Sequence, residues 1–297
     1  MSSDVDVAKT RLKEYQGISE EIITSANDLQ LRKLAARYQD GLLLPMRAMG
    51  GKTPPISEHP SRPSAEINGK SVEYLIDAAS REQNPIMMKE LTLRRDNFRC
   101  VITRIADSLA CLQKRTVAPP STTLFTALAH IIPFPLAPRT NQPAEVKKST
   151  AIYEILSRFR GFEDFPMLPN DNINRLENSL TLTQDTRTWF GRLDIWLEAV
   201  EGAEDTYRLG RAHPYASQIN AGTVIKLSTT DPRLALPDPR LLALHAACAK
   251  VLHACGVADV VDKIIGDMED MNVLSTEGTE ESIDLLRALL VYWELRE

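Results

Sequence analysis

The sequence has no long apolar run and few cysteines. No stretch of about eighteen consecutive apolar residues occurs, so no segment is expected to cross a membrane as a helix. The opening residues MSSDVDVAKTRLKEY lack the apolar core of a signal peptide. The four cysteines, at 100, 111, 248 and 255, are dispersed, which favours free thiols over a disulfide framework. We therefore expect a soluble, intracellular, cytoplasmic protein, or a nuclear one if it cleaves nucleic acid.

A surplus of basic residues is also missing. The 35 lysines and arginines are outnumbered by 40 aspartates and glutamates, which gives a net charge of −5. Proteins that bind nucleic acid usually neutralise phosphates with a basic surface. The charge balance therefore argues against nucleic acid as a partner, although a local basic patch is compatible with it. The remaining composition is typical of one large or two small globular domains.

Helical periodicity dominates both ends of the chain. Residues 5–49 and 71–94 carry apolar positions at helical spacing, the latter interrupted before Pro85. Between them, residues 52–63 hold four prolines, which predicts a linker or an irregular loop. A helix is also expected over 149–159. At the C-terminal end, Asp238 followed by Pro239 predicts the start of a helix that Gly256 ends, and two more helices are expected over 258–271 and 280–294.

The middle of the chain has the composition and alternation of short strands. Runs of β-forming residues are followed by segments that alternate apolar and polar side chains, which predicts a small antiparallel sheet. These segments are 98–103, 129–134 and 180–182, and then 192–198, 206–209 and 223–227. Helices that flank an embedded β region predict an α+β fold.

Three segments of this middle region resemble one known family. They are RRDNFRCVIT (94–103), AHIIPF (129–134) and NSLTLTQDTRTWFG (178–191). Together they resemble the HNH-nuclease-like domains of fungal genomes over about residues 91–252. The resemblance implies a small strand–strand–helix (ββα) element with an antiparallel sheet, flanked by N- and C-terminal helices. It divides the chain into an N-terminal helical region (1–90, with the linker 52–63), an HNH-like domain with its tail helix (91–256) and C-terminal helices that pack on it (257–297).

The resemblance also assigns roles to individual residues. An HNH site holds one divalent cation beside the scissile phosphate, and the cation stabilises the charge that develops during hydrolysis. Matching the segments makes His130 the candidate general base and Asn178 the asparagine that orients the active loop. Arg187, nine residues after Asn178, stands where the family has its metal-binding histidine. A guanidinium has no free lone pair and stays protonated, so it cannot bind a metal. Arg104 is a second departure, because the family usually has glycine at this tight turn.

We therefore expect a site without metal or cofactor. His130, Asn178 and Arg187 form its predicted polar trio, and Phe134 and Trp189 are predicted to contact a hydrophobic small-molecule substrate. Fungal natural-product pathways recruit such scaffolds as cyclases, so the resemblance implies a repurposed enzyme, a pericyclase such as a norbornene-forming Diels–Alderase. A cycloaddition needs a shaped pocket and one polarising hydrogen bond.

Two other functions stay open. In a genuine metal-dependent endonuclease, Asp107, Asp171 or Asp185 would replace the missing ligand. In a non-catalytic interaction protein, the terminal helices would present a surface to a partner, and a homo-oligomer is compatible with either case.

Purely structural roles also remain open for individual residues. His130 could be a hydrogen-bonded core histidine, and Arg187 could pair with Asp185 or Asp194. His245 and the nearby cysteines lack the close pairs of a zinc site and favour a packed helix.

Overall fold

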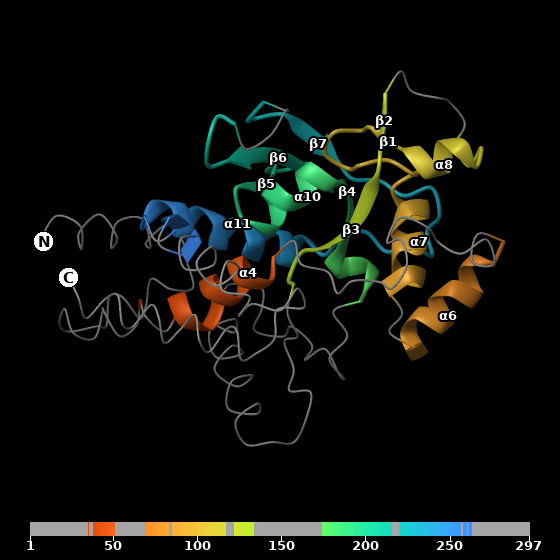
Figure 1. Ribbon diagram of the computed structural model, residues 1–297, viewed down its shortest axis with the longest axis horizontal. Helices are drawn as coiled ribbons and strands as arrows, with labels where there is room; N and C mark the ends of the chain where they lie inside the picture. The colour runs from red at the N-terminus through yellow and green to blue at the C-terminus, as the bar shows by residue number, and fades with distance from the viewer. Residues whose placement is uncertain are drawn as a thin grey trace, which may run out of the picture. The chain divides into compact units, whose positions relative to one another are not determined.

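The computed structural model (Figure 1) describes residue 35 and residues 38–50, 69–82, 85–116, 122–133, 174–215, 220–256, 258–259 and 261–262. These residues form both helices and antiparallel sheets, so the predicted α+β class is confirmed. Within them, no helix has the length and hydropathy needed to cross a membrane. They fall into two compact units, of which the second, Gly50–Pro133 with Asn172–Ala246, contains both sheets of more than two residues per strand.

The first unit contains the described parts of Met1–Met49 and Ala247–Glu297. A π-helical turn, η1 (Gln39–Leu43), continues into α4 (Leu44–Met49), which is the described end of the helix expected over 5–49. Arg47 of α4 is almost fully buried and binds Asp262 through two hydrogen bonds, Nε to Oδ1 at 2.9 Å and Nη2 to Oδ2 at 2.6 Å. This bidentate pair fixes α4 to the chain beyond α11 (Pro239–Ala254). The predicted linker 52–63, the helices at 149–159 and 280–294, and most of 258–271 lie outside the described residues.

Two helices form one side of the second unit. α6 (Val72–Glu82) and α7 (Pro85–Arg95) confirm the helical stretch that was predicted to break before Pro85. Proline suits the first position of a helix because its missing N–H would have no partner there. The two helices share one hydrophobic cluster with β3 and the segment before α11. Its buried members are Leu75, Ala78, Ala79, Met87, Met88, Leu91, Leu128 and Leu234.

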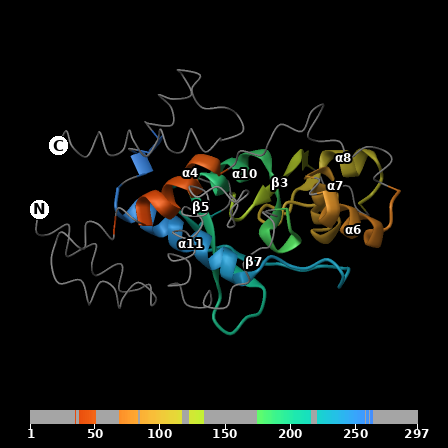
Figure 2. The same ribbon diagram turned by 90° about the horizontal axis from the view of Figure 1, so that it is seen from below.

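A strand–strand–helix element lies beside α7. β3 (Thr126–His130) pairs antiparallel with β4 (Ser179–Thr183), so that His130 lies opposite Ser179. A single 3₁₀ turn, η3 (Leu176–Asn178), leads into β4, and α10 (Gln184–Gly191) follows it directly. In both views β3 lies between α7 and α10 (Figure 1, Figure 2). The ends of β3, η3 and α10 therefore contribute to one region of the second unit.

The predicted small antiparallel sheet is present. It contains β5 (Ile195–Ala199), β6 (Thr206–Arg211) and β7 (Val224–Lys226) in that order. Apolar side chains alternate along β6, where Tyr207 and Leu209 are buried, as the sequence pattern predicted.

The helix predicted after Asp238 is α11 (Pro239–Ala254). The Asp238 carboxylate accepts a hydrogen bond from the backbone N–H of Arg240 at 2.8 Å and so caps the first turn. Gly256 follows the helix with a φ of 70°, a left-handed conformation that glycine adopts at low cost. Both predicted ends of this helix are confirmed.

The prediction of a short strand over residues 98–103 is wrong. Only Arg99 makes a β-bridge, to Ala106. The chain turns instead, because Asn97 and Phe98 both have a φ of 55° and the N–H of Cys100 bonds to the carbonyl of Ile105. Arg104 has a φ of 60°, so an arginine occupies the left-handed position of this turn. The turn leads into β1 (Ala106–Asp107), which pairs with β2 (Thr123–Leu124), and into α8 (Ser108–Leu112).

A buried arginine ties these elements together. The side chain of Arg95, the last residue of α7, is fully buried. Its guanidinium binds both carboxylate oxygens of Asp96, at 2.7 and 3.0 Å. It also donates to the carbonyls of Leu176 (2.7 Å), Ser179 (2.7 Å) and Ala235 (3.3 Å). One side chain therefore fixes α7 to η3, to the start of β4 and to the segment before α11.

Replacing this guanidinium should cost much of the stability of the fold. In Arg95→Met, the Asp96 carboxylate stays buried without its cation and three carbonyls lose a donor. We expect the free energy of unfolding to fall by about 3 to 5 kcal/mol, measured by urea denaturation. Arg208→Met changes an exposed arginine of β6 and should shift it by less than about 0.5 kcal/mol. Equal losses in the two variants would contradict the role given to Arg95.

Candidate functional site

His130 is the last residue of β3 and is partly exposed. Its Nε2 lies 3.0 Å from the amide oxygen Oδ1 of Asn174. Since an amide oxygen only accepts, Nε2 carries the proton and donates it to this bond. The neutral ring is thereby fixed in one tautomer, in which Nδ1 keeps a free lone pair.

The surroundings of His130 keep its ring neutral. Burial lowers the pKa of His130 to about 4; the hydrogen bond to Asn174 opposes this shift and the positive charge of Arg187 adds to it. At neutral pH the imidazole is therefore a hydrogen-bond acceptor without charge. A group with so low a pKa is a weak general base, because catalytic efficiency requires a pKa near the working pH.

Asn178 holds the backbone that follows His130. It is buried at the end of η3, and its Oδ1 accepts from the N–H of Ile132 at 2.8 Å while its Nδ2 donates to the carbonyl of Ile132 at 3.0 Å. The carbonyl of Asn178 also accepts from the N–H of Ile131 at 2.9 Å. These three bonds fix the two residues after the histidine. The side chain binds both backbone groups of Ile132, which is the geometry that an orienting asparagine needs.

Arg187 is on α10 and acts electrostatically on two neighbours. Its positive charge lowers the pKa of His130 and also that of Lys89. Burial lowers the pKa of Arg187 itself, although a guanidinium remains protonated at neutral pH. The structure therefore brings Arg187 into the electrostatic range of His130, and a fixed cation lies near the neutral imidazole.

Lys89 is a member of this region that the sequence analysis missed. It is on α7, only 5% exposed, and burial lowers its pKa while Asp107 raises it. Its sequence context, KELTLRR, is typical of the charged face of a surface helix, so nothing in the sequence distinguishes Lys89 from an exposed lysine. Lys89 and Arg187 place two cations in this region, where Asp107 and Glu90 act on Lys89 as opposing negative charges.

The structure describes two of the three aspartates considered as replacement metal ligands, Asp107 and Asp185. The Oδ1 of Asp107 accepts from the N–H of Ala110 at 2.8 Å, and its Oδ2 accepts from the N–H and Oγ1 of Thr126 at 3.0 and 2.7 Å. Asp185 is exposed in the first turn of α10, and Asp171 lies outside the described residues. Within the described part of the second unit, His130 belongs to no group of three or more side chains that could hold a metal.

The described residues test neither of the two predicted substrate contacts. Phe134 lies outside the described residues. Trp189 is partly exposed on α10, two residues after Arg187, and residues at this spacing do not face one another on a helix. Its place in a shared pocket stays a prediction.

His245 has a packing role. Its ring stacks on Phe190 with centroids 3.8 Å apart, and its Nε2 donates to the Phe190 carbonyl at 3.0 Å. Burial lowers the pKa of His245 to about 3, so the ring is neutral. This contact fixes the end of α10 to α11 and agrees with the packed helix preferred over a zinc site.

No protein-family model, curated protein or solved structure matches the chain. The chemistry of the site is therefore argued from its geometry. A neutral acceptor, His130, lies within electrostatic range of a cation, Arg187, and Asn178 holds the two residues that follow His130.

Removing the Asn178 clamp should loosen the loop after His130. In Asn178→Ala, the N–H and C=O of Ile132 lose their side-chain partners, and we expect a stability loss of about 2 kcal/mol. The amide of Ile132 should exchange with solvent faster than the amide of Leu209 in β6, measured by hydrogen exchange. If the Ile132 amide is as protected as in the native protein, the clamp does not hold the loop.

Two substitutions should move the pKa of His130 in opposite directions. Arg187→Gln removes a nearby positive charge and should raise it, whereas Asn174→Ala removes a hydrogen bond that favours the charged ring and should lower it. NMR titration of the ring protons, assigned with His130→Gln, measures both shifts. Because the pKa of His130 is lower in the folded protein, about 4 against 6.5, its contribution to stability is complete above pH 6.5 and is lost as the pH falls towards 4. An unchanged pKa in Arg187→Gln would place Arg187 out of range.

Proposed function

We propose that the chain is an HNH-type scaffold whose central site acts without a metal ion on a hydrophobic small molecule and promotes a cyclisation of the Diels–Alder type. The observation that carries the proposal is the geometry of His130, whose Nε2 lies 3.0 Å from Oδ1 of Asn174 and whose following loop is held by Asn178. The positive charge of Arg187 adds to it, since it acts on the His130 ring. Its catalytic groups are His130 and Arg187, and Asn178 is a positioning residue.

The charge of Arg187 disfavours a divalent cation at His130. A guanidinium provides no lone pair for a metal, and its repulsion of a divalent ion is twice that of a monovalent one. Lys89 adds a second positive charge to the same region. Asp107, the buried carboxylate near Lys89, already accepts three hydrogen bonds from the protein. Both effects favour a polar organic group over a metal ion.

A cycloaddition matches what these groups can supply. Its electrons move within one cyclic array, so the reaction needs neither a nucleophile nor a strong base. Arg187 can donate hydrogen bonds to a carbonyl that activates the alkene, and Nδ1 of His130 can accept one from a substrate hydroxyl. Holding diene and alkene together in a reactive conformer supplies the rest of the rate enhancement. A low pKa makes His130 a weak general base, but in this role the ring only accepts a hydrogen bond and does not have to take up a proton.

A cyclopentadiene tethered to an α,β-unsaturated carbonyl tests the proposal. We expect the protein to accelerate its cyclisation and to change the product ratio relative to buffer. Arg187→Gln should lose about 10²-fold in rate, since it removes a donor to the developing charge, whereas Arg208→Gln should have no effect. Chromatography of the products gives both rate and ratio. A rate and ratio equal to those in buffer would refute the proposed activity.

A metal-dependent endonuclease is the second candidate. Its support is the Asn178 clamp, because a nuclease of this type also requires an asparagine that holds the loop beside the histidine. Plasmid nicking in magnesium, manganese or zinc separates the two functions. Cleavage that disappears in His130→Ala would establish the nuclease and overturn the cyclase.

A further inference from the structure

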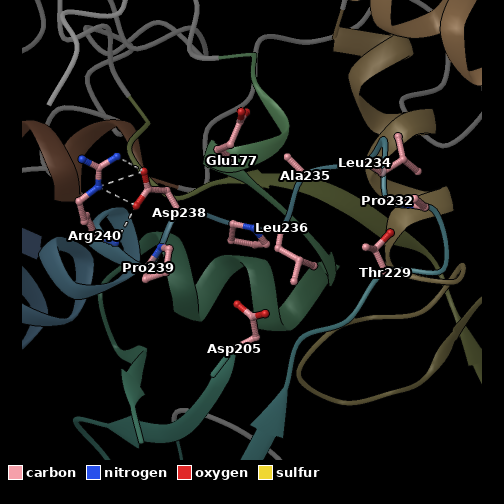
Figure 3. A pocket seen from close by; sticks show the side chains of 11 residues that line it. Glu177, Asp205, Thr229, Pro232, Leu234, Ala235, Leu236, Asp238, Pro239 and Arg240 are labelled. Atoms are coloured by element: carbon pink, nitrogen blue, oxygen red, sulfur yellow. Dashed lines mark hydrogen bonds and ion pairs between the residues drawn. The ribbon is translucent and has the colours of Figure 1, made fainter. Parts of the chain in front are cut away.

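A groove of about 690 Å³ opens in the second unit (Figure 3). This volume falls within the range of small-molecule sites. Its walls are the end of η3, the turn before β6 and the segment 229–240. The lining residues without charge are Thr229, Pro232, Leu234, Ala235, Leu236, Pro237 and Pro239. None of the groups assigned to the proposed function lines it, so the groove is an independent candidate site.

The charged residues of the groove are mostly acidic. Three carboxylates, of Glu177, Asp205 and Asp238, line it with a single guanidinium, that of Arg240. Asp238 and Arg240 neutralise one another through an ion pair with an Nη2–Oδ2 distance of 2.7 Å. Among the described residues, the Glu177 side chain makes one long ion pair, with the partly exposed Arg175 at 3.7 Å. An excess of negative charge therefore remains above an apolar floor.

Asp205 is the carboxylate best placed to receive a ligand. In the view of Figure 3, it lies on the opposite side of Leu236 from Glu177. Its side chain has no hydrogen-bond or ion-pair partner in the part of the chain that the structure describes. Its backbone is fixed, because its carbonyl accepts from the N–H of Leu227 at 2.9 Å. Burial and the negative charges of Asp205 and Asp238 raise the pKa of Tyr207 to about 12, so this phenol adds no charge of its own.

We propose that this groove binds a small organic ammonium ion, with its charged nitrogen against Asp205 and its hydrocarbon body on Leu236 and Pro237. The ammonium complements the unpaired carboxylate, and the hydrocarbon covers the apolar floor. A metal ion fits the groove poorly, because magnesium and calcium take six or more oxygen ligands. In the view of Figure 3, Glu177 and Asp205 lie on opposite sides of Leu236, and Asp238 is paired with Arg240.

Phenethylammonium and its neutral analogue 2-phenylethanol test this proposal by calorimetry and amide NMR. We expect saturable binding of the ammonium with a dissociation constant at least about tenfold lower than that of the alcohol, which corresponds to about 1.4 kcal/mol. The amide signals that shift should belong to residues 229–240 and to the residues beside Asp205. The full chain is used throughout.

Asp205→Asn is the decisive variant. It removes the charge and keeps the size, and asparagine tolerates the positive φ of 49° found at this position. Binding of phenethylammonium should weaken about tenfold, to the affinity of the alcohol. Glu204→Gln, which removes an exposed charge one residue away from outside the groove, should keep native affinity.

Three results would overturn the proposal. They are equal affinities for the ammonium and the alcohol, equal weakening in Asp205→Asn and Glu204→Gln, and shifts confined to residues away from both 229–240 and Asp205. A thermal melt of each variant verifies that the fold is intact. None of these results bears on the cyclisation assay, because the two sites share no residue.

Discussion

The buried guanidinium of Arg95 is the interaction on which the second unit depends. It binds the carbonyls of Leu176 and Ser179, which lie on either side of Asn178 in the chain, and that of Ala235 in the groove wall. A buried charge is tolerated only when its hydrogen bonds are satisfied, and here Asp96 and three carbonyls meet that need. The position of Asn178 follows from this contact, and Asn178 in turn holds the loop after His130.

The proposed chemistry depends on a difference in charge between His130 and Arg187. His130 is held neutral by burial, and its Nε2–H is committed to Asn174. Arg187 stays cationic and adds to the shift of His130. Arginine at this position thus has two effects, since it provides no metal ligand and also brings a permanent positive charge. An alanine would have only the first effect, so the arginine is the stronger argument for a different chemistry.

Local sequence signals predicted the elements whose cause is local. Pro85 and the Asp238–Pro239 pair mark the starts of α7 and α11, and alternation marks β5 to β7. The strand predicted over 98–103 is absent, because these β-forming residues lie in a turn in which Asn97 and Phe98 have positive φ angles. The hydrogen bonds of the Asp107 side chain could not be predicted either, since they depend on Thr126, which is 19 residues away in the chain. Lys89 and Arg95 looked like ordinary helix charges, because only the packed fold decides which charges are buried.

The central claim is that the charge of Arg187 makes the His130 site unsuited to a divalent cation. Titration with Mn²⁺, followed by paramagnetic broadening of the His130 ring signals, tests it most directly. The account predicts no selective broadening in the native protein and saturable broadening in Arg187→His, which restores a possible ligand and removes the charge at neutral pH. Selective, saturable broadening of His130 in the native protein would contradict it.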